Sequence, residues 1–322
     1  VLGLGGRTIA PPLRPDDAAV AVWCLGDGFA VLHRSLPAVG RIAVPADDGL
    51  GPRRWGLMAY AVRAILSEMA ISGPPPVPTG PPPGPSPAAL YAEVSARWTP
   101  AQRDALDAAT VLFLERTRAR AMAGDGGEIR SLGHVTVAAV ARAAGVSRRS
   151  VYNHWSSSDE LRLDLLRWLL AAERRRYVAA LDRVVEAKPA PGPGRTAAVV
   201  SSLLVHPTAD RLPIPHIPLA FLAEADHPAV RSTLVRGYEE TLAAVATRVE
   251  RLWPRAARPS GEELDADALA VVLVSLASGA NRLLRIDPGA LHPPGPARRP
   301  TVLAAAVQAL LDHEPWTRAP GA

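Results

Sequence analysis

The sequence is poor in the residue types that build disulfides, thiolate metal sites and membrane spans. It has one cysteine, Cys24, in 322 residues, so the chain forms no disulfide within itself and no thiolate metal site. Its most apolar stretch, Ala268 to Ala280, is shorter than the roughly 20 residues that cross a bilayer. We therefore expect a reduced, cytoplasmic protein without membrane partners, in which this stretch is a core helix.

A leader and a strong charge of one sign are also missing. The segment from Val1 has no basic region followed by a long apolar region, so no signal peptide is predicted, and the absence of an initiator methionine indicates a processed or incomplete chain. Of the 36 basic residues only Lys188 is a lysine, a bias typical of GC-rich coding sequences. The formal net charge of +5 is too small to indicate a nucleic-acid partner by itself.

Proline is concentrated in a few segments. Nine of the fifteen residues from Gly73 to Pro87 are prolines, which excludes a helix and favours a semi-rigid polyproline linker. Weaker breaks, Lys188 to Gly194 and His292 to Pro300, end helical patterns. Between the breaks the chain is rich in alanine, leucine and arginine, and no alternating pattern bounded by turns indicates a hairpin. The sequence therefore predicts an all-α fold.

Two segments match each other in pattern and largely in residue type. Asp16 to Leu66 aligns with Asp267 to Leu311, and each predicts a helix, a proline-bearing loop and a second helix. We favour a duplication; the alternative is a chance likeness between alanine-rich amphipathic helices. The aligned pairs include Leu25 with Leu276, Gly28 with Gly279, Leu32 with Leu283, Pro37 with Pro288, Arg53-Arg54 with Arg298-Arg299, and Ala61 to Leu66 with Ala306 to Leu311.

The first copy carries an apolar stripe at helical spacing. A lone helix pair cannot bury such a stripe, so it needs a partner surface. The stripe comprises Val22, Leu25, Phe29, Leu32 and Leu36.

The segment from Val135 predicts a helix-turn-helix followed by a supporting helix. Thr136 is expected to cap the first short helix and Ser147 the second. Gly145 suits the left-handed conformation of the turn, which Val146 is expected to plug. The residues expected to face inward are Val137, Val140, Ala141, Ala144, Val151 and Trp155.

The remaining positions of the second helix predict a face that reads DNA. Arginine pairs with guanine edges or phosphates and asparagine reads adenine, while hydroxyl groups and imidazole hold the backbone. From Ile129 to Ser158 there are four arginines and no acidic residue. The predicted DNA-binding residues are Thr136, Ser147, Arg148, Arg149, Ser150, Tyr152, Asn153, His154 and Ser158. For Tyr152 a place in the local core is the alternative, and for His154 a solvated surface position.

These residues resemble the TetR family of bacterial transcription regulators, whose signature runs through a helix-turn-helix and into the next helix. The resemblance implies a preceding helix, which Pro100 to Ala121 supplies with Leu106, Ala109, Phe113 and Val111 inward. The chain departs from the family in a longer join between this helix and the helix-turn-helix, Gly124 to His134, and in Ser158, where relatives usually carry a lysine. Ser157 and Glu160 still form a capping box.

The resemblance further implies a helical effector-binding domain after the helix-turn-helix. A long helix from Leu161 to Val185 buries Leu165, Trp168, Leu169 and Ala172, and its Arg174-Arg175-Arg176 is interpreted as a solvated face. Further helices include Ala229 to Leu252 and Asp265 to Arg285. The candidate effector-binding residues are Trp168, Tyr177, His216 and Phe221.

In relatives the last two helices form a four-helix bundle with the same pair of a second subunit. Residues 267 to 311 fit that role, and residues 1–71 resemble the end of a preceding TetR-like unit, which makes the arrangement tandem. Residues 72–97 are then the linker, 98–165 the DNA-binding domain and 166–316 the effector-binding and dimerisation domain. The chain forms either a homodimer or an intramolecular pseudo-dimer with one reading head.

The function expected from the sequence is a TetR-like transcriptional regulator associated with the bacterial nucleoid. It is a repressor that binds double-stranded operator DNA, and a small-molecule effector releases it by changing the separation of the reading heads. The alternative is a helical ligand- or partner-binding protein whose reading head is decayed or incomplete. No catalytic, metal or cofactor motif is present, so we expect neither an enzyme nor a bound cofactor.

Overall fold

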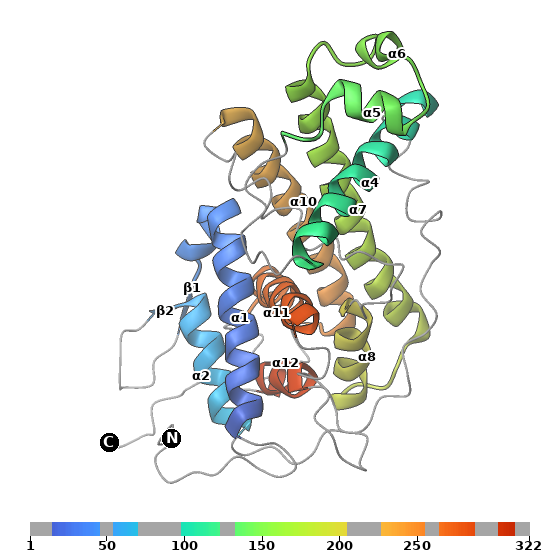
Figure 1. Ribbon diagram of the computed structural model, residues 1–322. Coiled ribbons are helices and arrows are strands. Elements are labelled where there is room, and N and C mark those ends of the chain that lie inside the picture. The colour runs from blue at the N-terminus through green and yellow to red at the C-terminus, as the bar shows by residue number, and fades with distance from the viewer. Residues whose placement is uncertain are drawn as a thin grey trace, which may run out of the picture. The chain divides into compact units, whose positions relative to one another are not determined.

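The computed structural model describes residues 15–45, 54–69, 98–122, 133–204, 227–254, 264–286 and 302–312. Nearly all regular structure in these ranges is helical, which confirms the all-α prediction (Figure 1). The exception is an antiparallel hairpin of β1 (Ala43–Pro45) and β2 (Arg54–Gly56), in which Val44 pairs with Trp55. The hairpin was not predicted because strands of three residues are too short to show an alternating pattern.

Contacts divide the chain into two compact units. The first, called the bundle unit, contains α1 (Pro15–Ser35), the 3₁₀-helix η1 (Pro37–Arg41), β1, β2, α2 (Leu57–Met69), α8 (Pro193–Leu203), α11 (Ala266–Ile286) and α12 (Val302–Asp312). The second, called the head unit, contains α4 (Pro100–Met122), α5 (Val137–Ala143) and α6 (Arg148–Tyr152). Two helices contribute to both units and divide after Arg176 and after Thr241: α7 (Ser158–Ala187) and α10 (Pro228–Leu252).

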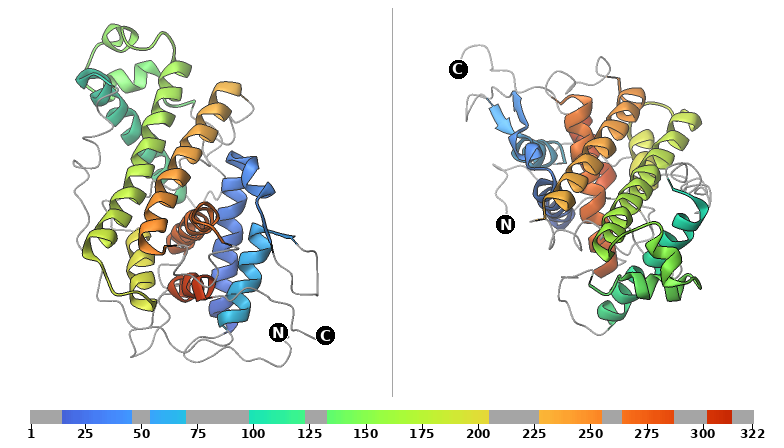
Figure 2. Two further views of the ribbon diagram at one scale, coloured as in Figure 1. Left: turned by 180° about the vertical axis from the view of Figure 1, so that it is seen from behind. Right: turned by 90° about the horizontal axis from the view of Figure 1, so that it is seen from above.

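The centre of the bundle unit is a crossing of α1 and α11 (Figures 1 and 2). A Cβ atom added at Gly28 would overlap the backbone of Ser275, and one added at Gly279 would overlap the backbone of Cys24. Only glycine allows two helix backbones to approach this closely. The predicted core helix at Ala268 to Ala280 is therefore confirmed: α11, although long and apolar enough to cross a membrane, packs inside the bundle unit.

The second helix of each copy completes the bundle. α2 packs against α12, and α8 packs against α12 as well. The hydroxyl of Thr196 on α8 donates to the side-chain oxygen of Gln308 on α12 at 2.6 Å. Because α8 covers one face of α12, all of that helix except Gln308 and Asp312 is buried.

The predicted apolar stripe of α1 is only partly buried. Leu25, Leu32 and Leu36 are buried, whereas Val22 and Phe29 are half-buried. The buried face of α1 is rotated toward smaller residues, since the close crossing with α11 needs them there: Ala18, Ala21, Cys24 and Gly28.

One carboxylate ties the head unit together. Oδ2 of Asp164 on α7 accepts the indole N–H of Trp155 at 3.0 Å and that of Trp98 at 3.4 Å. Its Oδ1 is 2.7 Å from Arg167 Nη1. Both indoles are buried and cannot donate to water, so the carboxylate supplies the hydrogen-bond partner that their N–H groups need. The carboxylate thereby joins the residues just before α4 and just after α6 to the start of α7.

Helix 1 of the predicted three-helix unit is present as α4. Thr99 and Gln102 form a capping box at its start, and Pro100 occupies its first turn. Leu106, Ala109 and Phe113 are buried as predicted. The inward position expected for Val111 was wrong, since 51% of that residue is exposed on the opposite face.

The interpretation of Arg174-Arg175-Arg176 as a solvated face is also wrong. Arg175 is buried and Arg176 half-buried, and Arg174 forms an ion pair with Glu240 on α10. The neighbouring Glu173 is only 5% exposed, and burial raises its pKa to about 7, against the opposing effect of Arg176. Leu165, Trp168, Leu169 and Ala172 are buried as predicted.

The predicted domain boundaries remain predictions. Residues 71, 72 and 97 lie outside the described residues, as does the whole linker from 72 to 97. The boundary at residue 165 falls within α7.

We predict that Asp164→Ala lowers the stability of the head unit by about 3 kcal/mol, because it strands two buried indole donors and one arginine. Hydrogen exchange of the α5 and α6 amides measures this opening free energy. Asp159→Ala is the matched control, since Asp159 pairs with Arg162 at 2.9 Å but its side chain is 86% exposed. Such a surface pair contributes at most about 1 kcal/mol. Equal effects of the two substitutions would contradict the prediction.

From the raised pKa of Glu173 we predict that the folded chain loses stability as the pH rises. The pKa of Glu173 is 4.5 when its side chain is fully solvated, as in the unfolded chain, and about 7 in the folded chain, so between these values the folded chain holds a proton that the unfolded chain has released. Stability should fall through this window, by on the order of 3 kcal/mol, and stay low above it. Glu173→Gln should remove the dependence, and Glu239→Gln, at an exposed position on α10, should not. Urea unfolding from pH 4.5 to 8 tests this; unchanged pH profiles for Glu173→Gln would refute it.

Candidate nucleic-acid interface

The turn of the helix-turn-helix is built by local hydrogen bonds that the sequence predicted. The hydroxyl of Thr136 accepts the amide N–H of Ala139 at 3.2 Å and that of Ser147 accepts the amide N–H of Ser150 at 3.0 Å, so each caps its helix. Gly145 has a φ of +68°, the left-handed conformation expected of it. The amide N–H groups of Gly145 and Val146 donate back to Arg142 and Ala141, which closes a Schellman motif.

The interior of the motif agrees with the prediction at most positions. Val137, Val140, Ala141, Val151 and Trp155 are buried. Two positions differ because the Schellman motif turns the chain outward there.

Ala144 is half-buried, and Val146 is 45% exposed. The expectation that Val146 plugs the turn is therefore wrong. Backbone hydrogen bonds hold this turn in its place.

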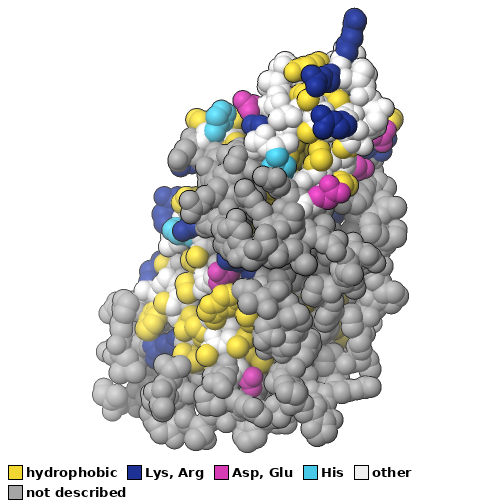
Figure 3. All heavy atoms as spheres, in the orientation of Figure 1, with side chains coloured by type: hydrophobic (Ala, Val, Ile, Leu, Met, Phe, Trp, Pro, Cys, Tyr) yellow, Lys and Arg dark blue, Asp and Glu magenta, His cyan; other side chains and the backbone are white. Residues whose placement is uncertain are grey.

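The predicted reading face of α6 is open to solvent. Arg148, Arg149, Ser150 and Asn153 are exposed, and Tyr152 is 54% exposed, which excludes the alternative that its ring lies in the local core. Figure 3 shows Lys and Arg side chains together over the part of the molecule that carries α5 and α6. The structure thus brings the exposed arginines, a phenol and an amide onto one short helix.

Two predicted contact residues are partly engaged elsewhere. His154 is half-buried, with its ring against the edge of Trp155 at a centroid distance of 5.8 Å. The hydroxyl of Ser158 accepts the amide N–H of Val137 at 3.2 Å, so this side chain joins the starts of α5 and α7. Its phosphate contact stays a prediction.

The capping box at the start of α7 differs in one bond from the expected pattern. Ser157 accepts the amide N–H of Glu160 at 3.1 Å, as expected. The carboxylate of Glu160, however, accepts the amide N–H of Ser156 at 2.7 Å, one residue earlier than the usual partner. The start of the helix is capped in either case.

The loop that enters α5 is held by a residue that sequence reasoning did not identify. Nε of Arg162 donates to the carbonyl oxygen of Val135 at 3.0 Å, and its Nη2 lies 3.5 Å from the carbonyl oxygen of Gly133. The rest of the long join, residues 124–132, lies outside the described residues. Arg162, like Asp164, supports the reading face without belonging to it.

Two of the candidate effector-binding residues lie within the part of the chain that the structure describes. Trp168 is buried with its ring edge-on to Trp98 at 5.2 Å, and Tyr177 is buried with its hydroxyl 3.5 Å from Oγ of Ser278. His216 and Phe221 lie outside the described residues. An effector role for these residues stays a prediction.

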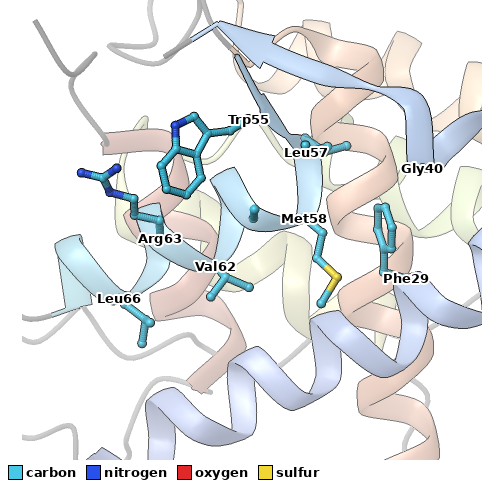
Figure 4. Close-up of a pocket in the computed structure, with 10 residues that line it drawn as sticks. Phe29, Gly40, Trp55, Leu57, Met58, Val62, Arg63 and Leu66 are labelled. Carbon is cyan, nitrogen blue, oxygen red and sulfur yellow. The ribbon is translucent and has the colours of Figure 1, made fainter. Parts of the chain in front are cut away.

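A cavity of about 710 Å³ lies elsewhere, on the outer face of α2 in the bundle unit (Figure 4). Phe29 of α1, Trp55 of β2, and Met58 and Val62 of α2 line its apolar wall. Arg63 contributes a cation and lies 4.9 Å from the centre of the Trp55 ring. The volume is within the range that binds small molecules.

The sequence contained a signal for this cavity in the aligned copies. Met58, Val62 and Leu66 follow each other at helical spacing and correspond to Leu303, Val307 and Leu311 of α12. The α12 residues are buried, whereas those of α2 are half-buried. Within the described ranges these apolar positions of α2 are only partly covered, and a partly covered apolar surface can take up an apolar molecule.

Within the described residues, no group of three or more His, Cys, Asp or Glu side chains is placed to hold a metal ion. The chemistry available on α6 is therefore that of hydrogen bonding and positive charge. Both are what DNA recognition uses.

Comparison with known proteins agrees with this geometry. A family described as bacterial regulatory proteins, tetR family, matches residues 130–165, which include α5, α6 and the first turns of α7. No curated protein matches the chain. Members of this family are regulators that bind DNA through a helix-turn-helix rather than enzymes. The capped turn, the buried core and the exposed basic helix lie at the matched residues, so this part of the chain is a DNA-binding helix-turn-helix of the type found in the tetR family of bacterial regulatory proteins.

Proposed function

We propose that this regulator represses transcription by occupying operator DNA through the exposed face of α6, and that a small apolar or amphipathic effector releases it. The observation that carries the DNA-binding part is the open side of α6, where Arg148, Arg149, Tyr152 and Asn153 are exposed around a buried Val151. Arginine and asparagine are the side chains best suited to guanine and adenine edges in the major groove. Such a regulator works in the cytoplasm, at the nucleoid.

The roles within the face follow from chemistry and exposure. Arg148 and Arg149 supply charge for phosphates or guanine, and Asn153 has the bidentate amide that reads adenine. Ser147, Ser150, Thr136 and the Tyr152 hydroxyl are suited to phosphate oxygens. His154 and Ser158 add contacts at the margin.

A reading head that has lost its function is the competing hypothesis. The intact caps at Thr136 and Ser147 and the buried indole of Trp155 support the head as a functional unit. Selection of bound sequences from random duplex DNA tests the proposal with the purified chain. An enriched motif supports operator reading, and the absence of any enriched sequence would overturn it.

We predict that Arg148→Ala weakens DNA binding and reduces its salt dependence. Each phosphate neutralised contributes about −0.9 to the slope of log affinity against log salt, so loss of one contact should lower the slope by about 1. Tyr152→Phe should weaken binding with little change in slope, because its contact carries no charge. The measurement is fluorescence anisotropy of a labelled duplex across a salt series.

Arg34→Ala is the control for this prediction. It removes the same charge from an exposed position at the end of α1, in the bundle unit. Its slope should match that of the unaltered chain. A slope that falls equally in Arg148→Ala and Arg34→Ala would show that net charge, and not the face of α6, sets the affinity.

For the effector we propose the cavity of Phe29, Trp55, Met58, Val62 and Arg63 as the binding site. Its apolar wall suits a hydrocarbon or aromatic body, and Arg63 suits a carboxylate at the rim. An apolar carboxylate is therefore the effector class that fits these residues.

We predict that decanoate binds the chain and that Val62→Trp abolishes binding by filling the cavity. Arg63→Gln should weaken binding by roughly tenfold, because a charge-assisted hydrogen bond to the carboxylate is lost. Isothermal titration calorimetry measures both effects, with Ala19→Trp, at an exposed position of α1, as the control for added bulk. Undiminished binding to Val62→Trp would exclude this cavity as the site.

A further inference from the structure

The contacts between α1 and α11 are reciprocal. Gly28 lies against the Cα, carbonyl carbon and carbonyl oxygen of Ser275, and Gly279 lies against the same three backbone atoms of Cys24. Cys24 and Ser275 each lie four residues before the aligned glycine of their own helix. The glycine of each copy thus contacts the residue that lies four positions before the glycine of the other copy. This reciprocity is the geometric mark of a two-fold interface between like subunits.

The same correspondence extends over the rest of the bundle. In the first helices, Ala21 with Val272 and Leu25 with Leu276 are aligned pairs in which both members are buried. In the second helices, which pack against each other, the aligned buried pairs are Leu57 with Val302, Ala61 with Ala306, Ala64 with Ala309 and Ile65 with Leu310. A chance likeness between alanine-rich helices would not put the aligned residues at equivalent places in one interface.

We infer that the segment from Asp16 to Leu66 takes the place of a second subunit's helix pair. It occupies the pairing face of α11 and α12 within the same chain. The chain is then a monomer that forms its own pseudo-dimer and carries one reading head. The pairing is argued from the contacts alone, and only the DNA-reading role of the head rests on the proposed function. A second chain cannot use the same face, because the backbone of Ser275 is in contact with Gly28 and the side chain of Asp27 pairs with Arg282 at 3.0 Å.

The inference changes how DNA is read. A homodimer presents two equal heads and selects an inverted repeat with half-sites about one helical turn apart. One head per molecule selects a single half-site without internal symmetry. Release by a change in the separation of two heads is then excluded, and an effector has to lower the affinity of the one head.

The first experiment measures the solution mass of the full chain by light scattering after gel filtration, over a hundredfold range of concentration. We expect 33.9 kDa throughout. A mass of twice that value would overturn the inference, because it would mean that the helix pairs join between chains. The measurement needs no DNA, so it is independent of whether the head reads an operator.

The second experiment uses Cys24 as a reporter of the crossing. Cys24 is fully buried against Gly279, and a thiol there should react slowly with a maleimide. Gly28→Leu and Gly279→Leu both force the backbones apart and should raise the labelling rate by roughly tenfold or more, equivalent to about 1.4 kcal/mol in the opening equilibrium. Gly56→Ala is the matched control, since a Cβ there meets no atom within 4 Å.

Opening the crossing also has to change the mass. The freed face of α11 and α12 should pair between molecules, so Gly28→Leu should associate while the unaltered chain stays at 33.9 kDa. Labelling at the unaltered rate in both glycine variants would overturn the inference. A general loss of helix, seen by circular dichroism, is distinguished from opening by the retained amide protection of α5 and α6 in the head unit.

DNA selection separates failure of the inference from failure of the proposed function. A single asymmetric motif with a monomeric mass supports both. An inverted repeat with a dimeric mass overturns the inference and supports operator reading. No enriched motif with a monomeric mass overturns operator reading, and the mass still supports pairing within the chain.

Discussion

The close crossing of α1 and α11 is the constraint on which the bundle unit depends. Two helix backbones in contact at Gly28 and Gly279 leave no space for side chains between them, and α2 and α12 both pack against α1. The crossing also determines the chemistry of the lone cysteine. Burial, with a smaller contribution from Asp27, raises the pKa of Cys24 to about 12, so its thiol is held protonated and unreactive.

The head unit has a different basis, because its helices are too short to be stable by themselves. α5 has seven residues and α6 has five, below the length at which isolated helices form in water. Their stability comes from two caps, a Schellman motif and the carboxylate of Asp164 between two indoles. None of these contacts uses the side chains of Arg148 and Arg149. These two arginines are exposed to solvent.

Local patterns in the sequence were sufficient for the elements and the turn. Thr136, Gly145 and Ser147 act through bonds to residues three or four positions away, so spacing alone predicts their roles. Val146 is turned outward by the local Schellman motif, whereas the failures at Val111 and Arg175 concern burial, which depends on helices distant in the sequence. Asp164 was missed for the same reason, since its bond to Trp98 spans 66 residues. The repeat was visible in sequence, but only the structure shows that the two copies are in contact.

The two copies differ in what covers their second helix, and this difference accounts for the cavity. On α12 the apolar residues Leu303 and Val307 face α8, and a void of only about 10 Å³ remains between them. The aligned residues of α2, Met58 and Val62, instead line the cavity of about 710 Å³. The aligned segments carry a similar apolar face, and within the described residues α8 covers only that of α12. A small apolar molecule can therefore bind beside α2 without separating the glycines at the crossing, where the two helix backbones leave it no room.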